Sequence, residues 1–288
     1  GDWETIAPQD VPRTSVSKAI IAGRLSYRFS LRGEAQVIDT ACSSALVALN
    51  IARQACADRL ASLVIVVQMN LDSRIWVSLR RDKMLSITGR CFSFNASADG
   101  FVRAEGCVAA VVSREPTTGY ADDKSAELLS VYTNSNHRSS TLTAPHGPSQ
   151  KALIHGAMHL AGRRPQDVEY IECHGTGTQM GDAIEVAVLL GDVFNSADTR
   201  LIADKALLGH MEGAAGLAGF FRLLSCSGMI PTVLHLRELN PNIGLALHGA
   251  SDARMPAEHC GLLVRSGERI RGVSAFGFGG TNAHALVA

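Results

Sequence analysis

Strand-like and helix-like segments alternate along this chain, and that alternation constrains the fold more than any other feature. Short runs rich in Val, Ile and Leu are typical of buried strands, and they recur between longer segments with helical spacing of apolar residues. The predicted strands are Ala35–Asp39, Leu63–Val67, Cys107–Ser113, Leu128–Asn134, Val168–Glu172, Ile270–Phe276 and His284–Val287. The predicted helices are Ser15–Phe29, Ser43–Cys56, Ser149–Ala161, Gly181–Val193 and Gly213–Met229. Because several strands are almost continuously apolar, as in sheets covered on both faces, the pattern predicts an α/β fold.

A polar connection, Glu115–Ser125, divides the chain into two halves. It contains Pro116, Gly119 and three acidic residues, which interrupt both kinds of pattern. Each half holds a glycine-marked strand-to-helix turn that carries a reactive residue. The sequence therefore predicts two domains, residues 1–115 and residues 116–288.

Composition excludes several classes of function. With 27 basic and 27 acidic residues the chain is formally neutral, which argues against binding to nucleic acid or anionic lipid. The longest apolar stretches, such as Leu63–Val67 and Val186–Leu190, are too short to span a membrane, and we see no basic and apolar leader. Seven scattered cysteines without a C-x-x-C pair argue against a disulfide framework or a zinc knuckle. We expect a soluble protein of a reducing compartment, either the cytoplasm or an organelle stroma or matrix.

A cysteine stands at one predicted strand-to-helix bend. Cys42 follows the strand-like run that ends at Asp39 and precedes the helix predicted from Ser43. Free backbone N–H groups and the positive end of a helix dipole at such a bend favour thiolate over thiol. A thiol of pKa about 8.5 is only ~3% ionised at pH 7, so a lowered pKa enlarges the nucleophilic population. Cys42 is a candidate nucleophile, and packing as a small buried hydrophobe is the alternative.

Two histidines occupy comparable bends in the C-terminal half. His174 follows the predicted strand Val168–Glu172 and precedes glycines and threonines, which suits a loop that approaches a ligand closely. His210 precedes a small-residue helix, where an imidazole is pushed toward its neutral form. Taken singly, either histidine is also consistent with a structural role.

A glycine-rich turn lies within Phe276–His284. Its three glycines allow tight turns and expose backbone N–H groups. The spacing matches neither a Walker A motif nor a dinucleotide-binding fingerprint, so the sequence argues against nucleotide binding.

Six peptides combine these residues in one order along nearly the whole chain. They are DTACSSALVAL at 39–49, GRCFSFNASADGFVRAEG at 89–106, TAPHGPSQ at 143–150, HGTGTQMGDAIE at 174–185, GHMEGAAGLAG at 209–219 and GVSAFGFGGTNAHALV at 272–287. This set resembles the β-ketoacyl synthase family, the condensing enzymes of fatty-acid and polyketide synthesis. The motifs TACSS, HGTGT-x-x-GD and GH-x-E are most similar to those of ketosynthase domains of type I polyketide synthases. The resemblance implies a thiolase-like fold, in which two similar βαβαβ halves form a layered α-β-α-β-α architecture.

The resemblance implies roles for the reactive residues. Cys42 is expected to take an acyl group from an acyl-carrier-protein thioester. His174 and His210 are expected to bind the malonyl thioester carbonyl and to assist the loss of carbon dioxide. The backbone N–H groups of Cys42 and Phe278 are expected to hold the oxyanion, and the Phe278 ring resembles the family's gating aromatic.

It also implies a supporting set of polar residues. Thr176 and Thr178 match hydroxyls that hydrogen-bond the pantetheine arm. Lys205, Asp182 and Glu185 match a buried charged network that orients the histidine loop, with a surface ion pair as the alternative. The implied reaction requires no metal and no organic cofactor, since the substrates are carried on the phosphopantetheine of acyl carrier protein.

Four positions depart from the family pattern. Ala206 and Leu207 follow Lys205, where Ser and Asn are usual, so we expect a looser network around the lysine. Ala183 replaces a usual Pro and Ala275 a common Ser, and we expect both to be tolerated.

The start of the chain also departs from the family. A strand-helix-strand unit usually precedes the helix matched by Ser15–Phe29, whereas only fourteen residues precede it here. A sheet without interior strands leaves unpaired backbone groups. We therefore expect an incomplete N-terminal half, completed by a missing segment or by a second chain.

The implied partners are acyl carrier protein and a second copy in a homodimer. Arg80, Arg81 and Lys83 form a candidate basic patch for the acidic carrier, with a solvated charged face as the alternative. The strand Leu63–Val67 is too apolar to be expected at an exposed edge.

An inactive or scaffolding relative is the main alternative function. A thiolase is a less favoured alternative, because thiolases use a second catalytic cysteine near the C-terminus, where this chain has GFGGTNAH.

Overall fold

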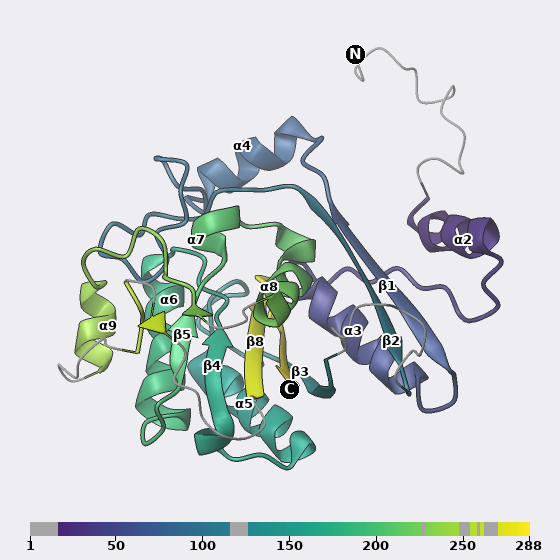
Figure 1. Cartoon of the computed structure of the whole chain (residues 1–288). Helices are drawn as coiled ribbons and strands as arrows, with labels where there is room; N and C mark the ends of the chain where they lie inside the picture. Colours follow the sequence, from purple (N-terminus) through teal and green to yellow (C-terminus); the bar gives the residue numbers. More distant parts are fainter. Residues whose placement is uncertain (1–16, 116–125, 226–228, 248–253, 258–259, 262–269) are drawn as a thin grey trace. The chain divides into compact units, whose positions relative to one another are not determined.

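The computed structural model describes residues 17–115, 126–225, 229–247, 254–257, 260–261 and 270–288. The chain forms two compact units, Gly1–Asp39 and Thr40–Ala288 (Figure 1). The predicted connection Glu115–Ser125 lies outside the described residues except for Glu115.

Helix α2 (Lys18–Phe29) is the regular element described in the first unit. It ends at Ser30, whose φ of 54° is left-handed, and none of its residues is buried. Of the predicted helix, Ser15 and Val16 lie outside the described residues. The predicted strand Ala35–Asp39 is wrong, because this segment is irregular and pairs with no described strand. An apolar run becomes a strand only when a neighbouring strand takes up its backbone hydrogen bonds.

The second unit is built on a five-stranded mixed sheet in the order β3-β9-β8-β4-β5. Its strands are β3 (Leu128–Ser135), β9 (Thr281–Val287), β8 (Ile270–Phe276), β4 (Val168–Glu172) and β5 (Arg200–Ile202). Strand β4 runs parallel to β5 and β8, whereas β9 is antiparallel to β8 and β3. Because β4, β5 and β8 are parallel, their C-terminal ends meet at one edge of the sheet.

A second sheet is a two-stranded antiparallel ribbon of β1 (Ala61–Gln68) and β2 (Gly106–Ser113). Its pairing places Leu63 opposite Val111 and Val67 opposite Cys107. One face of the ribbon packs on helix α3 (Ser44–Ala55) through residues such as Val64, while the other face exposes apolar side chains.

Helices lie on both faces of the five-stranded sheet. Val131 of β3 packs with Leu46 and Leu49 of α3, whereas the neighbouring Ser130 hydroxyl donates to the carbonyl of Ala157 in α5 (Gly147–Ala161). Because successive strand residues point to opposite faces, α3 and α5 cover opposite faces. Helix α8 (Ala215–Ser225) packs beside α3 and against β8.

Several shorter elements complete the described part of the chain. They are α4 (Ser73–Arg81), α6 (Gln179–Val186), a π-helical turn (Ala187–Val193), α7 (Lys205–Leu208), α9 (Pro241–Ala246), β6 (Met229–Ile230), β7 (Cys260–Gly261) and two 3₁₀ turns (Pro165–Asp167 and Glu212–Ala214).

The α/β prediction is confirmed, and two helix predictions need correction. The helix predicted for Gly181–Val193 begins earlier, at Gln179, and changes to π-helix from Ala187. The helix predicted for Gly213–Met229 ends at Ser225 in its described part, and Met229 instead begins a strand. Its backbone pairs with Gly261, a tertiary contact that local pattern does not reveal.

Candidate active site

The site lies where the parallel strands end. His174 comes two residues after β4, His210 follows β5 and α7, and the turn containing Phe278 joins β8 to β9. Cys42 precedes α3, which packs on the same sheet. The fold thus brings together four segments that are far apart in the sequence.

Cys42 sits on a tight turn at the start of α3. The residue before it, Ala41, has a left-handed φ of 54°, which an alanine adopts only at some energetic cost. Side-chain hydrogen bonds fix this turn: the Thr40 N–H donates to Ser44 Oγ at 2.8 Å, and Ser44 Oγ–H donates to the Ala41 carbonyl at 2.7 Å. The Ser44 side chain therefore holds the bend that presents the thiol.

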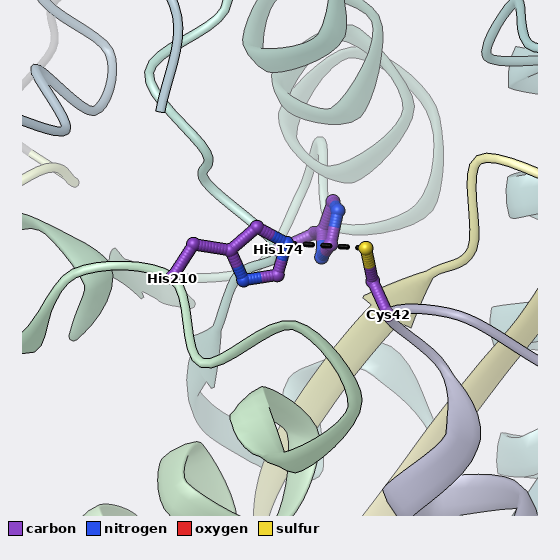
Figure 2. Close-up of side chains that lie close together, drawn as sticks. All are labelled: Cys42, His174 and His210. Atoms are coloured by element: carbon purple, nitrogen blue, oxygen red, sulfur yellow. Dashed lines mark hydrogen bonds between the residues drawn. The ribbon is translucent and has the colours of Figure 1, made fainter. Parts of the chain in front are cut away.

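The two histidines converge on this thiol (Figure 2). His210 Nε2 lies 3.1 Å from Cys42 Sγ. The His174 and His210 rings are nearly perpendicular to each other, with centroids 5.5 Å apart and an interplanar angle of 85°. One donor atom from each of the three residues lies within 4.8 Å of the other two.

The pKa of the Cys42 thiol is raised to about 11, mainly because burial disfavours the thiolate and secondly because of the Glu212 carboxylate. Lys205 and the backbone N–H groups of Phe278 and Cys42 lower the pKa but do not outweigh burial. The expectation of a lowered pKa from the helix position is therefore wrong, because desolvation exceeds the effect of the bend. The thiol is protonated at rest and must lose its proton as it reacts.

Both imidazoles are held neutral. Burial lowers the pKa of His174 and of His210 well below the ordinary range, and the positive charge of Lys205 acts in the same direction. The sequence predicted a neutral His210, and the lowered pKa agrees with that prediction. Burial, rather than the following helix, is the leading cause. Neutral His210 can accept the Cys42 proton at Nε2.

Two buried carboxylates fix the loop after His174. Glu185 accepts hydrogen bonds from the backbone N–H groups of His174 at 2.7 Å and Gly175 at 2.9 Å. Asp182 accepts from the N–H groups of Gly177 at 3.2 Å and Phe94 at 2.8 Å. Burial raises the pKa of each carboxyl to about 7, while these same N–H donors lower it. Both acids thus bind the loop backbone directly.

Lys205 lies beneath the site rather than on the loop. Its side chain is buried, and Nζ lies 3.7 Å from Asp204 Oδ1. Asp204 and Glu172 raise the pKa of the lysine against the opposing effect of burial. The replacements that follow it differ in environment, since Ala206 is buried whereas Leu207 is exposed. The charged group is therefore internal, and the surface ion pair considered from sequence does not describe it.

The two threonines of the loop face each other. Thr176 Oγ1 and Thr178 Oγ1 lie 3.2 Å apart. Thr176 is buried and Thr178 is partly buried, at the N-terminus of α6. Each hydroxyl retains capacity for further hydrogen bonds.

The glycine turn after β8 touches the Cys42 turn. A Cβ on Gly277 would meet the Thr40 carbonyl oxygen at 2.5 Å and Ser43 Oγ at 3.0 Å, so only glycine allows this approach. The close contact brings the Phe278 N–H to the Cys42 sulfur, next to the N–H of Cys42 itself. The Phe278 side chain is 49% exposed and so lies at an open part of the surface.

One ion pair at the site was missed from the sequence. Arg103 donates through Nε to Glu212 Oε1 and through Nη2 to Oε2 at 3.3 Å, and Glu212 also accepts from Gln68 Nε2 at 3.1 Å. Trp76 of α4 stacks on the guanidinium, 4.8 Å from ring centroid to Cζ. Arg103 lies in the peptide GFVRAEG and Glu212 in the peptide GHMEG. Their opposite charges were the only indication in the sequence that the two side chains form a contact.

This pair joins the strand region before β2 to the His210 turn. The His210 N–H donates to the Val102 carbonyl at 2.8 Å, and the Ala104 N–H donates to the His210 carbonyl at 2.9 Å. Glu212 adopts a left-handed φ of 39°, which the ion pair helps to hold. The backbone on both sides of Arg103 therefore positions His210.

Fold and site together define an α/β protein with a cysteine thiol, two neutral histidines and two backbone N–H donors at one sheet edge. The family model for the N-terminal domain of β-ketoacyl synthase matches residues 4–117, and the model for the C-terminal domain matches residues 125–237. The chain belongs to the β-ketoacyl synthase family.

Curated relatives are components of polyketide synthases. One phenolphthiocerol/phthiocerol polyketide synthase component of Mycobacterium tuberculosis is 38% identical over 284 residues, which cover 95% of this chain and 15% of the relative. Another component of the same synthase, from the same species, is 36% identical over 290 residues, covering 98% of this chain and 19% of the relative. The chain thus spans less than a fifth of these relatives.

Solved structures of ketosynthases share the fold. The oxazolomycin ketosynthase domain OzmH KS7 of Streptomyces albus JA3453 has a TM-score of 0.86 at 32% identity, covering 96% of this chain and 50% of that one. The ketosynthase from module 6 of the bacillaene synthase of Bacillus subtilis 168 has a TM-score of 0.84 at 32% identity, covering 94% and 50%. This chain therefore spans about half the length of each of these structures. Their similarity confirms the prediction of a thiolase-like fold. None of the described helices is long and apolar enough to cross a membrane.

Proposed function

We propose that this chain is the ketosynthase of a polyketide or fatty-acid assembly and that it condenses an acyl group on Cys42 with a malonyl unit on acyl carrier protein. The observation that carries the proposal is the 3.1 Å contact between Cys42 Sγ and neutral His210 Nε2, with His174 beside it. The polyketide synthase relatives support the substrate class.

In the first step, Cys42 attacks the carbonyl of the acyl thioester. Its proton passes to His210 Nε2, because a thiol of pKa about 11 is too weak a nucleophile without a base. The departing pantetheine sulfur takes that proton, which leaves acyl-Cys42 and returns His210 to its neutral form. The N–H groups of Cys42 and Phe278 stabilise the oxyanion, and each such donor is typically worth about 10²- to 10³-fold in rate.

In the second step, the malonyl unit loses carbon dioxide. The electron pair of the broken carbon–carbon bond passes into an enolate, whose oxygen is stabilised by the N–H of His174 and by His210 in the tautomer that carries its proton on Nε2. Neutral imidazoles suit this role because they donate a hydrogen bond without readily protonating the carbon. That carbon then attacks acyl-Cys42, the thiolate leaves, and a proton taken up from solvent restores the thiol. The electrons come from the broken bond, so no further cofactor enters the proposed reaction.

The supporting residues have separate proposed roles. Thr176 and Thr178 hydrogen-bond the pantetheine arm, while Asp182 and Glu185 hold the His174 loop. The charge of Lys205 adds to burial in keeping both imidazoles neutral. We propose acyl carrier protein and a second copy of the chain as partners. We also propose that a further segment or chain lies beside β1, because β1 pairs only with β2 among the described strands.

The test is incubation with an acyl thioester, followed by peptide mass spectrometry. We expect acylation of the peptide containing Cys42, loss of acylation in Cys42→Ala, and no change in Cys107→Ser, which alters an exposed cysteine on β2. Acylation absent from Cys42 in the folded protein would sink the enzymatic proposal and favour the inactive or scaffolding alternative.

A further inference from the structure

The reaction centre also has the composition of a zinc site. Cys42, His174 and His210 each offer one donor atom, and all three atoms lie within 4.8 Å of one another (Figure 2). In tetrahedral zinc sites, Zn–S is about 2.3 Å and Zn–N about 2.0–2.1 Å, so neighbouring donors lie roughly 3.3–3.6 Å apart. The Sγ–Nε2 separation of 3.1 Å lies just below that range, and any donor pair as far apart as the 4.8 Å limit must close by more than about 1 Å when the ion binds.

We infer that this centre binds one Zn²⁺ ion through Cys42, His174 and His210, and that the ion competes with the acyl group for Cys42. The inference uses the residues of the proposed function but does not depend on turnover. One thiolate and two imidazoles form a set that zinc favours among divalent cations, and three protein ligands leave a fourth position for water. Binding displaces the thiol proton, which leaves to solvent, and no electron transfer is involved.

Access favours a cation at this place, whereas the nearby charges act in both directions. Cys42 and His174 are partly exposed, so an ion from solvent can reach them, whereas His210 is buried. The Glu212 carboxylate is close enough to raise the pKa of Cys42, and it would also attract a cation. Lys205 and Arg103 oppose binding, although Arg103 is paired with Glu212.

The surroundings point to reversible binding rather than a structural site. Metal-bound histidines usually donate their second ring N–H to a carbonyl or carboxylate, which strengthens the ligand. Within the described part of the chain, Nδ1 of His174 and Nδ1 of His210 are buried without a hydrogen-bond partner. Zinc here therefore lacks that support, and we expect an affinity weaker than that of structural sites.

The experiment uses chelator-stripped full chain and Zn²⁺ alone. Calorimetric titration should give one zinc per chain with release of about one proton, and stoichiometric Zn²⁺ should slow alkylation of Cys42 at least tenfold, reversibly with EDTA. Co²⁺ as a probe should give a sulfur-to-metal charge-transfer band. Cys42→Ala should lose the band and weaken zinc binding at least tenfold, and His210→Ala should weaken zinc binding to a similar extent.

Cys107→Ser is the matched control, because it removes an exposed cysteine and should leave all three readouts unchanged. Circular dichroism should establish that the variants are folded. Equal zinc affinity in Cys42→Ala, or unprotected Cys42 in saturated protein, would overturn the inference. These readouts do not require acyl transfer, so a chain that binds zinc but fails to condense would refute only the proposed function.

Discussion

At the level of single residues, opposing effects act on the Cys42 thiol. Two backbone N–H groups and Lys205 favour the thiolate, whereas burial and Glu212 disfavour it more strongly, and the pKa rises to about 11. A resting thiol with a neutral acceptor 3.1 Å away is protected from adventitious electrophiles. It becomes nucleophilic when a bound carbonyl lets the proton move to His210.

The raised pKa predicts the pH dependence of Cys42 alkylation in chelator-treated buffer. Because the thiolate fraction rises about tenfold per pH unit below the pKa, the rate with iodoacetamide should climb steadily from about pH 7 to about pH 10. Peptide mass spectrometry separates Cys42 from Cys107 in the same digest. A plateau at about pH 8 would instead indicate a preformed thiolate–imidazolium pair.

The Arg103–Glu212 pair makes a second prediction at this level. Glu212→Gln leaves the buried guanidinium uncompensated and should lower the free energy of unfolding by about 1–3 kcal/mol in urea titrations. It should also lower the pKa of Cys42, since the Glu212 charge raises it. Asp192→Asn, which breaks a half-exposed ion pair with Lys151, should cost only about 0–1 kcal/mol and leave the alkylation profile unchanged. An unchanged profile in Glu212→Gln would contradict this interpretation.

At the level of elements, the site depends on contacts between loops that end different strands. The turn after β8 approaches the Cys42 turn, and the carboxylates of α6 hold the turn after β4. These turns are short and hydrogen-bonded to buried groups, so the sheet edge fixes the donor positions before any substrate arrives.

Gly277 tests the importance of that approach. Gly277→Ala places a Cβ 2.5 Å from the Thr40 carbonyl oxygen, so the turn must move and the Phe278 N–H must leave the sulfur. Acylation of Cys42 should slow by roughly 10²-fold or more, the typical effect of losing one oxyanion donor. Gly279→Ala is the control, since its Cβ would meet nothing within 4 Å, and it should acylate at nearly the normal rate. Equal rates in the two variants would argue against the Phe278 donor.

At the level of the molecule, the β1–β2 ribbon carries a largely uncovered apolar face within the second unit. Leu63, Val67 and Val111 are 41%, 53% and 66% exposed on it. The expectation that Leu63–Val67 is too apolar for an exposed edge is also wrong among the described strands, since β1 pairs there only with β2. Apolar character describes what a strand prefers to contact, whereas exposure depends on which other elements cover it.

The exposed ribbon predicts self-association. Sedimentation of the purified chain should show association that rises with concentration, and Val111→Lys should reduce it because a charge disfavours burial of this face. Val77→Lys is the matched control: Val77 is 68% exposed on α4 rather than on the ribbon, and its change should leave association as it was. If both variants behave alike, the ribbon is not the associating surface.

Local sequence pattern is sufficient for the α/β class and for most strand positions, and it selects Cys42, His174 and His210 as candidates, which the structure places close together. Periodicity and glycine placement are local properties, and β4 and β8 have the predicted bounds, Val168–Glu172 and Ile270–Phe276. Tertiary contacts, in contrast, set the pKa of Cys42, the pairing of Arg103 with Glu212, the irregular segment before Cys42 and the exposed face of the ribbon. Each of these depends on burial or on partners distant in sequence, and a local pattern contains no information about which distant groups share a low-dielectric interior.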